Sequence, residues 1–251
     1  MRSNGEFSTR FGTIKYFTEG FGGDYAVMLQ GWATDRSLYD GIVSVLAEKY
    51  TVIFPALPGF GESDEPREPM SVSDYAEAIN LLLENLGVKR AHFFCHSFGG
   101  RVFFKLNAME SRFTEPDSVI LCDVAGIVPQ KSFAKRMKMK LYKLGKRILP
   151  RAAAAMRSRV GSADYNAASE VMKKTLVLAV NEDLRHLFQQ IDVPTLIMWG
   201  REDDAVPLSD AYIIESSVAD SAVIVFEKSG HFPFITEQAR FLAVVRSFFA
   251  I

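Results

Sequence analysis

The chain has 251 residues, of which 48% are hydrophobic, 24% charged and 12% aromatic, and its formal net charge is −1. This composition is typical of a globular protein and excludes a disordered, collagen-like or coiled-coil chain. A near balance of 29 basic and 30 acidic residues argues against a nucleic-acid partner, which a strongly positive chain would attract. No apolar run reaches the roughly 20 residues that a membrane span needs, so we expect no integral membrane contact.

The cysteines and the amino-terminal residues predict a compartment. Two cysteines, Cys95 and Cys122, are too few for a disulfide framework and favour a reducing environment. Residues 1–12 are polar and do not resemble a secretory signal peptide. We therefore expect a soluble cytoplasmic protein. No feature of the sequence predicts its oligomeric state.

Taken in chain order, short apolar runs alternate with helical patterns. Residues 10–17 are predicted to form an antiparallel edge strand or hairpin. The apolar runs that follow are typical of buried strands, and they lie at 25–29, 51–54, 91–95, 118–122, 195–199 and 222–226. Between residues 72 and 86, apolar side chains recur at spacings of three, four and seven, which predicts a helix with Ser71 as its N-cap and Asp74 three residues on. This alternation predicts an α/β fold with a mostly parallel central sheet flanked by helices.

The alternation is interrupted once, between residues 126 and 190. No acidic residue occurs from 124 to 163, whereas residues 131–160 hold eleven lysines and arginines. We interpret residues 126–190 as an inserted helical cap, and residues 1–125 and 191–251 as the core. The basic residues have three interpretations: a solvated helical face, attraction of an anionic substrate, or contact with an anionic membrane surface.

A serine stands where a predicted buried strand runs directly into a helix. Ser97 follows the run 91–95 and is flanked two positions away by small residues, Cys95 and Gly99. A turn this tight places the serine in a strained backbone conformation, and a bulky residue at either flanking position would collide with neighbouring backbone. The alternative is a serine that caps a tight turn.

This segment resembles the nucleophile elbow, G-x-S-x-G, of the α/β-hydrolase family, with Cys95 in the place of the first glycine. The order serine, aspartate, histidine is also the order of that family. The resemblance covers nearly the whole chain outside the predicted cap and implies the α/β-hydrolase fold. Four further segments carry it: the oxyanion loop 29–33, the PGFGxS loop 58–63, the acid loop 199–207 and the histidine loop 228–234.

The resemblance implies a role for each residue. Ser97 is the expected nucleophile, His231 the base that takes its proton, and Asp203 the acid that orients the imidazole. The backbone N–H groups of Trp32 and Phe98 are the expected oxyanion hole. We expect no cofactor, and no metal, because no histidine, cysteine or carboxylate cluster has metal-ligand spacing.

Some positions keep a second interpretation. Asp123 ends a predicted strand, where some relatives carry the acid, and it is the alternative to Asp203. Glu202 and Asp204 are interpreted as solvated loop charges. The remaining histidines are interpreted as structural or exposed: His92 and His96 packed near the elbow, and His186 on the cap surface.

Two positions depart from the family pattern. Gln30 replaces the histidine usual before the oxyanion glycine, and Ala56 replaces the aspartate usual before the Leu57–Gly59 turn. Neither belongs to the predicted triad. The Gln30 amide can still hydrogen-bond the loop backbone.

Large apolar side chains adjoin the predicted site, which favours an apolar or aromatic substrate group held by burial. Ordinary core packing is the alternative for these residues. The predicted substrate pocket comprises Gln30, Phe60, Met137, Tyr142 and Phe232.

The leading functional hypothesis is a serine hydrolase that cleaves a small carboxylic ester through an acyl-enzyme. A second hypothesis keeps the same serine, histidine and aspartate in a C–C bond hydrolase or lyase acting on an anionic keto-acid; it draws on the Gly99-Gly100-Arg101 sequence and the basic cap. A third is a non-catalytic binding protein with the same fold. For the two enzymatic hypotheses the expected partner is a small-molecule substrate.

Overall fold

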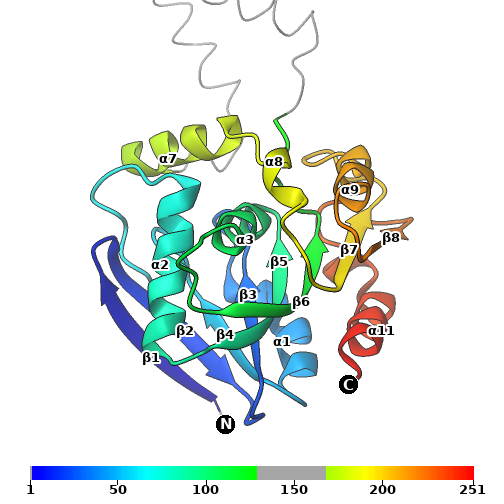
Figure 1. Ribbon diagram of the computed structural model, residues 1–251, viewed down its shortest axis with the longest axis horizontal. Helices are drawn as coiled ribbons and strands as arrows, with labels where there is room; N and C mark the ends of the chain where they lie inside the picture. The colour runs from blue at the N-terminus through cyan, green and yellow to red at the C-terminus, as the bar shows by residue number, and fades with distance from the viewer. Residues whose placement is uncertain (1, 129–167) are drawn as a thin grey trace, which may run out of the picture.

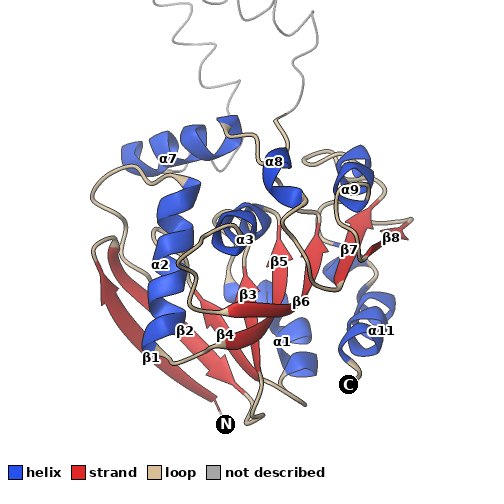
Figure 2. Cartoon of the chain, in the orientation of Figure 1, coloured by secondary structure: helices blue, strands red, loops and turns tan. Residues whose placement is uncertain are grey.

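The computed structural model describes residues 2–128 and 168–251, and their strands form one eight-stranded sheet (Figure 2). The strand order is β1-β2-β4-β3-β5-β6-β7-β8. Strands β4, β3, β5, β6, β7 and β8 run parallel to one another, whereas β2 is antiparallel to both of its neighbours. The strands are β1 (Arg2–Thr9), β2 (Gly12–Glu19), β3 (Tyr25–Leu29), β4 (Thr51–Pro55), β5 (Arg90–His96), β6 (Glu115–Cys122), β7 (Thr195–Gly200) and β8 (Ser221–Phe226).

The six predicted apolar runs all lie within the parallel strands, which confirms the predicted mostly parallel sheet. Residues 10–17, predicted as an antiparallel edge strand or hairpin, form the turn at Arg10 and Phe11 and most of β2. The segment is antiparallel and belongs to a hairpin, but it is not the edge strand, because β1 lies outside it. Strand β1 lies at the sheet edge, and most of its side chains are exposed. An edge strand buries few side chains, so its sequence lacks the apolar run by which the other strands were recognised.

Helices cover both faces of the sheet (Figure 1). One face packs against α2 (Val72–Asn85), α3 (Phe98–Asn107) and α9 (Leu208–Glu215), and the other against α1 (Asp40–Leu46) and α11 (Gln238–Phe249). Two separate apolar cores result, one on each face. Within residues 2–128 and 168–251, no helix combines the length and the apolar character needed to cross a membrane.

The predicted helix over 72–86 is confirmed as α2. Its N-cap is Ser71, whose Oγ accepts the Asp74 N–H at 3.2 Å, while the Asp74 carboxylate accepts the Ser71 N–H at 2.7 Å. This reciprocal capping box satisfies two of the amides that the first helical turn leaves without partners.

Most of the predicted cap, including all eleven basic residues, falls within residues 129–167 and therefore outside the described residues. The last part of the predicted cap contains α7 (Glu170–Asn181) and α8 (Arg185–Phe188). Met172, Ala179 and Phe188 are buried in the same apolar core as α2 and α3. The division of the chain into core and cap stays a proposal.

Candidate active site

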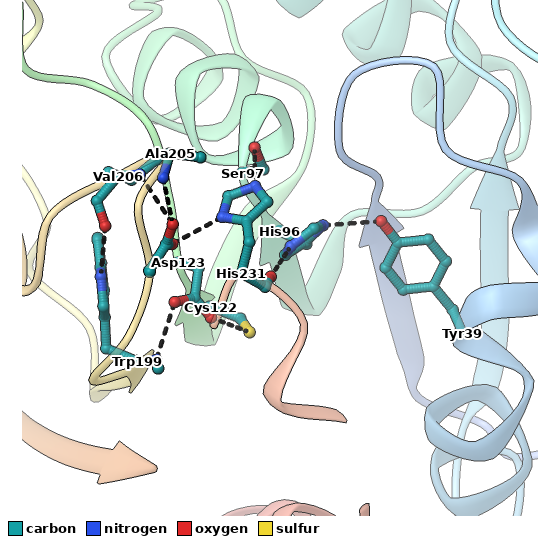
Figure 3. A network of polar contacts seen from close by, with 11 residues as sticks. Tyr39, His96, Ser97, Cys122, Asp123, Trp199, Ala205, Val206 and His231 are labelled. Atoms are coloured by element: carbon teal, nitrogen blue, oxygen red, sulfur yellow. Dashed lines mark hydrogen bonds and ion pairs between the residues drawn. The ribbon is translucent and has the colours of Figure 1, made fainter. Parts of the chain in front are cut away.

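Six parallel strands end at one edge of the sheet, and the predicted site residues follow these ends. Ser97 comes directly after β5, Asp203 after β7 and His231 after β8. Neighbouring parallel strands present their carboxyl ends at the same edge, where open α/β sheets bind their ligands. Residues far apart in the sequence therefore meet there (Figure 3).

Hydrogen bonds join the three side chains in a line. The Ser97 Oγ lies 2.9 Å from Nε2 of His231, and Nδ1 of His231 lies 2.7 Å from Oδ2 of Asp203. An ionised carboxylate only accepts hydrogen bonds, so Nδ1 carries the proton and Nε2 is free to accept from the serine hydroxyl. The geometry therefore suits proton transfer from Ser97 to His231.

The backbone of Ser97 is strained, with φ +51° and ψ −113°. Three backbone hydrogen bonds hold it: Ser97 N–H donates to Cys122 O at 3.1 Å, and Ser97 O accepts from Gly100 N–H at 3.1 Å and Ala125 N–H at 3.0 Å. Such a conformation persists only where the surroundings impose it, and it exposes the side chain at a sharp turn.

Close packing around the turn explains its small residues. A Cβ on Gly99 would collide with the carbonyl oxygen of Leu29, and one on Gly100 would collide with Val124. Cys95, in the place of the first glycine, is fully buried and pairs with Leu29 across β3 and β5. A cysteine therefore fits where the family has glycine.

The acid loop holds Asp203 in place. The amides of Ala205 and Val206 donate to its Oδ1 at 2.8 and 2.9 Å, and the side chain is fully buried. Burial opposes ionisation, but the hydrogen bond and charge of His231 and the two amides outweigh it, so the pKa of Asp203 lies below its usual value. Asp203 is therefore a carboxylate at neutral pH. Glu202 and Asp204 are exposed, as expected of solvated loop charges.

The acid and histidine loops are packed against each other. Glu202 N–H donates to Ser229 O at 2.9 Å, and a Cβ on Gly200 would collide with the carbonyl oxygen of Gly230. Glu237, which sequence reasoning missed, accepts from Lys228 N–H and Ser229 Oγ at 2.9 Å each. No motif marked Glu237, because its contacts depend on how α11 meets the loop.

Asp123 lies beside Asp203 but does not bond His231. It is fully buried at the end of β6, with φ +45°, and its Oδ1 accepts the Gly200 N–H at 2.9 Å. Burial, with the nearby charge of Asp203, raises the pKa of Asp123 to about 8. Of the two acids considered from the sequence, only Asp203 contacts the imidazole.

The predicted oxyanion loop lies against the elbow. A Cβ on Gly31 would lie 2.8 Å from Nδ1 of His96 and 3.3 Å from Cβ of Ser97. Phe98 is the first residue of α3, so its amide has no acceptor within the helix. Among the described residues, neither the Trp32 nor the Phe98 N–H has a hydrogen-bond acceptor. Both amides are thus available to an oxyanion.

Gln30 and Ala56, the two departures from the family pattern, line the same cavity. The cavity has a volume of about 410 Å³ and lies on the side of the β1–β2 hairpin, between Tyr16, Phe17 and Phe54. Gln30 is 2% exposed; its Nε2 donates to Thr34 O at 2.6 Å, whereas its Oε1 has no partner among the described residues. The expected bond from the Gln30 amide to the loop backbone is confirmed.

The predicted pocket residues differ in burial and in their position relative to His231. Phe60 is 2% exposed and packs against Trp32 at a ring-centroid distance of 4.9 Å, as part of the core. Phe232 is half-buried beside His231, with their ring centroids 5.2 Å apart. Met137 and Tyr142 lie outside the described residues.

The other three histidines are placed as expected. His96 is fully buried, and His92 is half-buried with Nδ1 2.8 Å from Ser118 Oγ. His186 is exposed on α8. The bonds of His96 to Tyr39 and His231 were missed from the sequence, because no local pattern links a tyrosine 57 residues away to the elbow.

Within residues 2–128 and 168–251, one group of side chains lies close enough together to hold a metal ion, although its spacing in the sequence did not indicate this. Asp123, Asp203 and His231 each offer an atom within 4.8 Å of the others. These atoms are already engaged, because His231 Nδ1 bonds Asp203 and Asp123 accepts the Gly200 amide. We assign no metal to this group.

The chain is similar to known proteins over most of its length. The model of the alpha/beta hydrolase family matches residues 26–244. A pimeloyl-(acyl-carrier protein) methyl ester esterase of Aliivibrio fischeri (strain MJ11) is 26% identical over 266 residues, which cover 94% of this chain and 97% of the relative.

Two solved structures share the fold. An esterase from Exiguobacterium antarcticum has a TM-score of 0.74 and 23% identity, covering 94% of this chain and 95% of its own. A meta-cleavage product hydrolase from Pseudomonas fluorescens IP01 has a TM-score of 0.73 and 20% identity, covering 98% and 97%.

The family match spans most of the chain and agrees with the strand order, the flanking helices and the serine turn described above. The chain therefore belongs to the α/β-hydrolase family and is an enzyme of that family.

Proposed function

We propose that this enzyme hydrolyses a small carboxylic ester through an acyl-enzyme formed on Ser97. The observation that carries the proposal is the hydrogen-bonded line from Ser97 Oγ through the His231 imidazole to the buried carboxylate of Asp203. A serine hydroxyl is a weak nucleophile at neutral pH, so a positioned base is the feature that ester attack requires.

In the first half-reaction, His231 Nε2 takes the hydroxyl proton while Ser97 Oγ bonds the ester carbonyl carbon. The carbonyl oxygen becomes an oxyanion, for which the Trp32 and Phe98 N–H groups are the proposed donors. Collapse of this intermediate breaks the bond to the alcohol oxygen, which receives the proton from His231. Asp203 stabilises the imidazolium throughout.

In the second half-reaction, water replaces the alcohol. His231 takes a proton from the water as its oxygen bonds the acyl carbon, and then returns the proton to Ser97 Oγ as the carboxylic acid leaves. His231 gives back each proton that it takes, so the cycle ends with the site unchanged.

The substrate is proposed to carry an apolar or aromatic group. Trp32 and Phe232 are half-buried, and they pack against Phe98 and His231 respectively. Burial of an apolar group is worth about 25 cal/mol per Å². The name of the Aliivibrio relative, a methyl ester esterase, supports ester chemistry for this chain. Met137 and Tyr142 remain proposed contributors, as does an attraction of the basic segment for an anionic substrate or surface.

The test combines turnover with active-site labelling. We expect the wild-type enzyme to hydrolyse short-chain p-nitrophenyl esters and to react with a fluorophosphonate probe, and Ser97→Ala to lose both. Labelling that persists in Ser97→Ala would exclude Ser97 as the nucleophile. A panel of esters of increasing acyl length, and of aromatic esters, would define the apolar preference.

The C–C bond hydrolase hypothesis remains the alternative, and the meta-cleavage product hydrolase with the same fold is the observation that favours it. Arg101 gives it no support, because the residue is only 4% exposed and its Nη1 donates to Glu182 O at 2.7 Å. Probe labelling of Ser97 without ester turnover, together with loss of a conjugated keto-acid measured by absorbance, would replace the ester proposal with this one.

We also propose a cytoplasmic location and a small-molecule substrate as the partner. The two cysteines are both buried and free, which supports a reducing compartment.

A further inference from the structure

His96, the residue before the proposed nucleophile, is fully buried and bonded at both ring nitrogens. Its Nε2 lies 2.9 Å from the backbone oxygen of His231, and its Nδ1 lies 2.9 Å from Oη of Tyr39 (Figure 3). A carbonyl oxygen only accepts, so Nε2 carries the proton and donates to it. Nδ1 of the neutral ring is then an acceptor, and Tyr39 Oη–H donates to it.

The neutral state of His96 follows from its surroundings. Burial, and next the proximity of His231, lower the pKa of His96 to about 3. The ring therefore keeps one proton at neutral pH, and the two hydrogen bonds determine which nitrogen holds it.

Tyr39 continues the connection to the oxyanion loop. Its Oη accepts the Gly31 N–H at 3.0 Å and lies 2.9 Å from Thr34 Oγ1. A continuous chain of hydrogen bonds thus runs from Gly31 N–H to Tyr39, from Tyr39 to His96, and from His96 to the backbone carbonyl of His231.

These hydrogen bonds also determine whether the Gly31 amide of the oxyanion loop can bind a substrate. Because Gly31 N–H donates to Tyr39, it is not available to a substrate, whereas the next amide, that of Trp32, has no acceptor among the described residues. Contact between Gly31 and the His96 ring fixes the separation of the loop from the elbow, since not even a methyl group fits between them.

We propose that Tyr39 and His96 are positioning residues that hold the oxyanion loop and the His231 imidazole in their correct positions relative to the elbow. The proposal rests on the proposed function, because it assigns Trp32 and His231 their catalytic roles. It adds that the hydrogen bonds of Tyr39 and His96 hold both the Trp32 amide and the His231 imidazole, so that loss of one of these bonds displaces both groups.

The principal variant is Tyr39→Phe, which removes one hydroxyl and keeps the ring. We expect kcat for a p-nitrophenyl ester to fall at least about 10-fold, because the lost hydroxyl bonds both Gly31 and His96, with KM nearly unchanged. The fluorophosphonate labelling rate should fall by a similar factor. The matched control is Tyr50→Phe: Tyr50 is equally buried, its Oη donates to Phe249 O at 3.2 Å, and it lies at the opposite end of the sheet.

A purely structural tyrosine would lower the melting temperature in both variants and leave kcat equal in both. That outcome would overturn the proposal. Should Tyr39→Phe not fold, His96→Gln and His96→Leu replace it. The glutamine can still donate an N–H towards His231 O, so it should retain more kcat than the leucine variant, and equal kcat in the two would also overturn the proposal.

A measurement independent of activity tests the tautomer. With only four histidines, nitrogen-15 spectra of the labelled wild-type protein can be assigned with single histidine variants. We expect His96 to show a protonated Nε2 and an acceptor Nδ1 from pH 5 to 9, with the Nδ1 shift altered in Tyr39→Phe. A protonated Nδ1 would overturn the proposal. Failure of wild-type protein to label at Ser97 would instead remove the proposed function, and this inference with it.

Discussion

Asp123 and Asp203 follow neighbouring strands, and each accepts backbone amides, yet only Asp203 bonds the imidazole of His231. Their surroundings drive the two pKa values apart: Asp203 is stabilised as a carboxylate by donors, whereas Asp123 is protonated by burial next to a charge. Two chemically identical side chains in one small volume are thus held in opposite protonation states.

The first prediction separates these two residues. Asp203→Asn should lower kcat/KM by about 10³- to 10⁴-fold, because an amide cannot favour the required imidazole tautomer. Asp123→Asn should keep kcat/KM within about 3-fold of the wild type at pH 7, because asparagine mimics the neutral acid and can still accept the Gly200 amide. Ester turnover measures both. A greater loss in Asp123→Asn than in Asp203→Asn would mean that the acid has been assigned to the wrong strand.

The second prediction concerns stability and pH. The folded chain keeps a proton on Asp123 up to a pKa of about 8, whereas an unfolded chain releases it near 3.8. The folded state then binds more protons across this window, so the free energy of unfolding should decrease as pH rises from about 4 to about 8. Urea titrations at several pH values should show a flatter profile for Asp123→Asn.

Asp203 has the opposite sign and a different window. Its lowered pKa contributes stability above its ordinary pKa, and that stability is lost as pH falls through the lower, folded value. The two effects can therefore be distinguished: Asp123→Asn should change the slope only above pH 4, whereas Asp203→Asn should also change it below. A slope above pH 4 identical in wild type and Asp123→Asn would contradict the assignment.

The third prediction tests strain at the serine turn. Both Ser97→Ala and Ser97→Gly remove the hydroxyl, but only glycine relieves a residue at φ +51°. We expect Ser97→Gly to unfold with a free energy about 1 kcal/mol greater than that of Ser97→Ala. Chemical denaturation of the two inactive variants provides the comparison, and an advantage for alanine would argue that the turn is not strained.

The fourth prediction concerns the close approach of α3 to β3. Gly99→Ala should lower the free energy of unfolding by about 3 kcal/mol, because its methyl group would meet the Leu29 carbonyl oxygen. Gly23→Ala is the matched control, since a Cβ there meets nothing within 4 Å. Equal urea midpoints for the two variants would show that the backbone moves freely at this point.

The sequence predicted the parallel strands because buried strands are continuous apolar runs, and it predicted Ser97, Asp203 and His231 because their loops follow recognisable patterns at strand ends. The structure brings these three side chains within hydrogen-bond distance, while their catalytic roles stay a prediction. Activity measurements on Ser97→Ala and Asp203→Asn test two of those roles.

What could not be predicted depends on contacts between distant segments. Tyr39 lies in no motif and reaches His96 only once η1 (Arg36–Tyr39) packs beside β5. The acid loop favoured Asp203 over Asp123 from the sequence, but only the coordinates show that Asp203 is hydrogen-bonded to His231 whereas Asp123 accepts the Gly200 amide. A local sequence pattern indicates which residues form turns or are buried, but not which distant residues contact one another.

The tight fit of Gly200 against Gly230, with the bond from Glu202 to Ser229, has a consequence for how a substrate enters. These contacts hold the loops that carry the acid and the base against each other, so we expect a displacement of one loop to move the other as well. We therefore expect a substrate to enter on the opposite side of the site, past the loop that carries Trp32, which Tyr39 and Gln30 hold through hydrogen bonds.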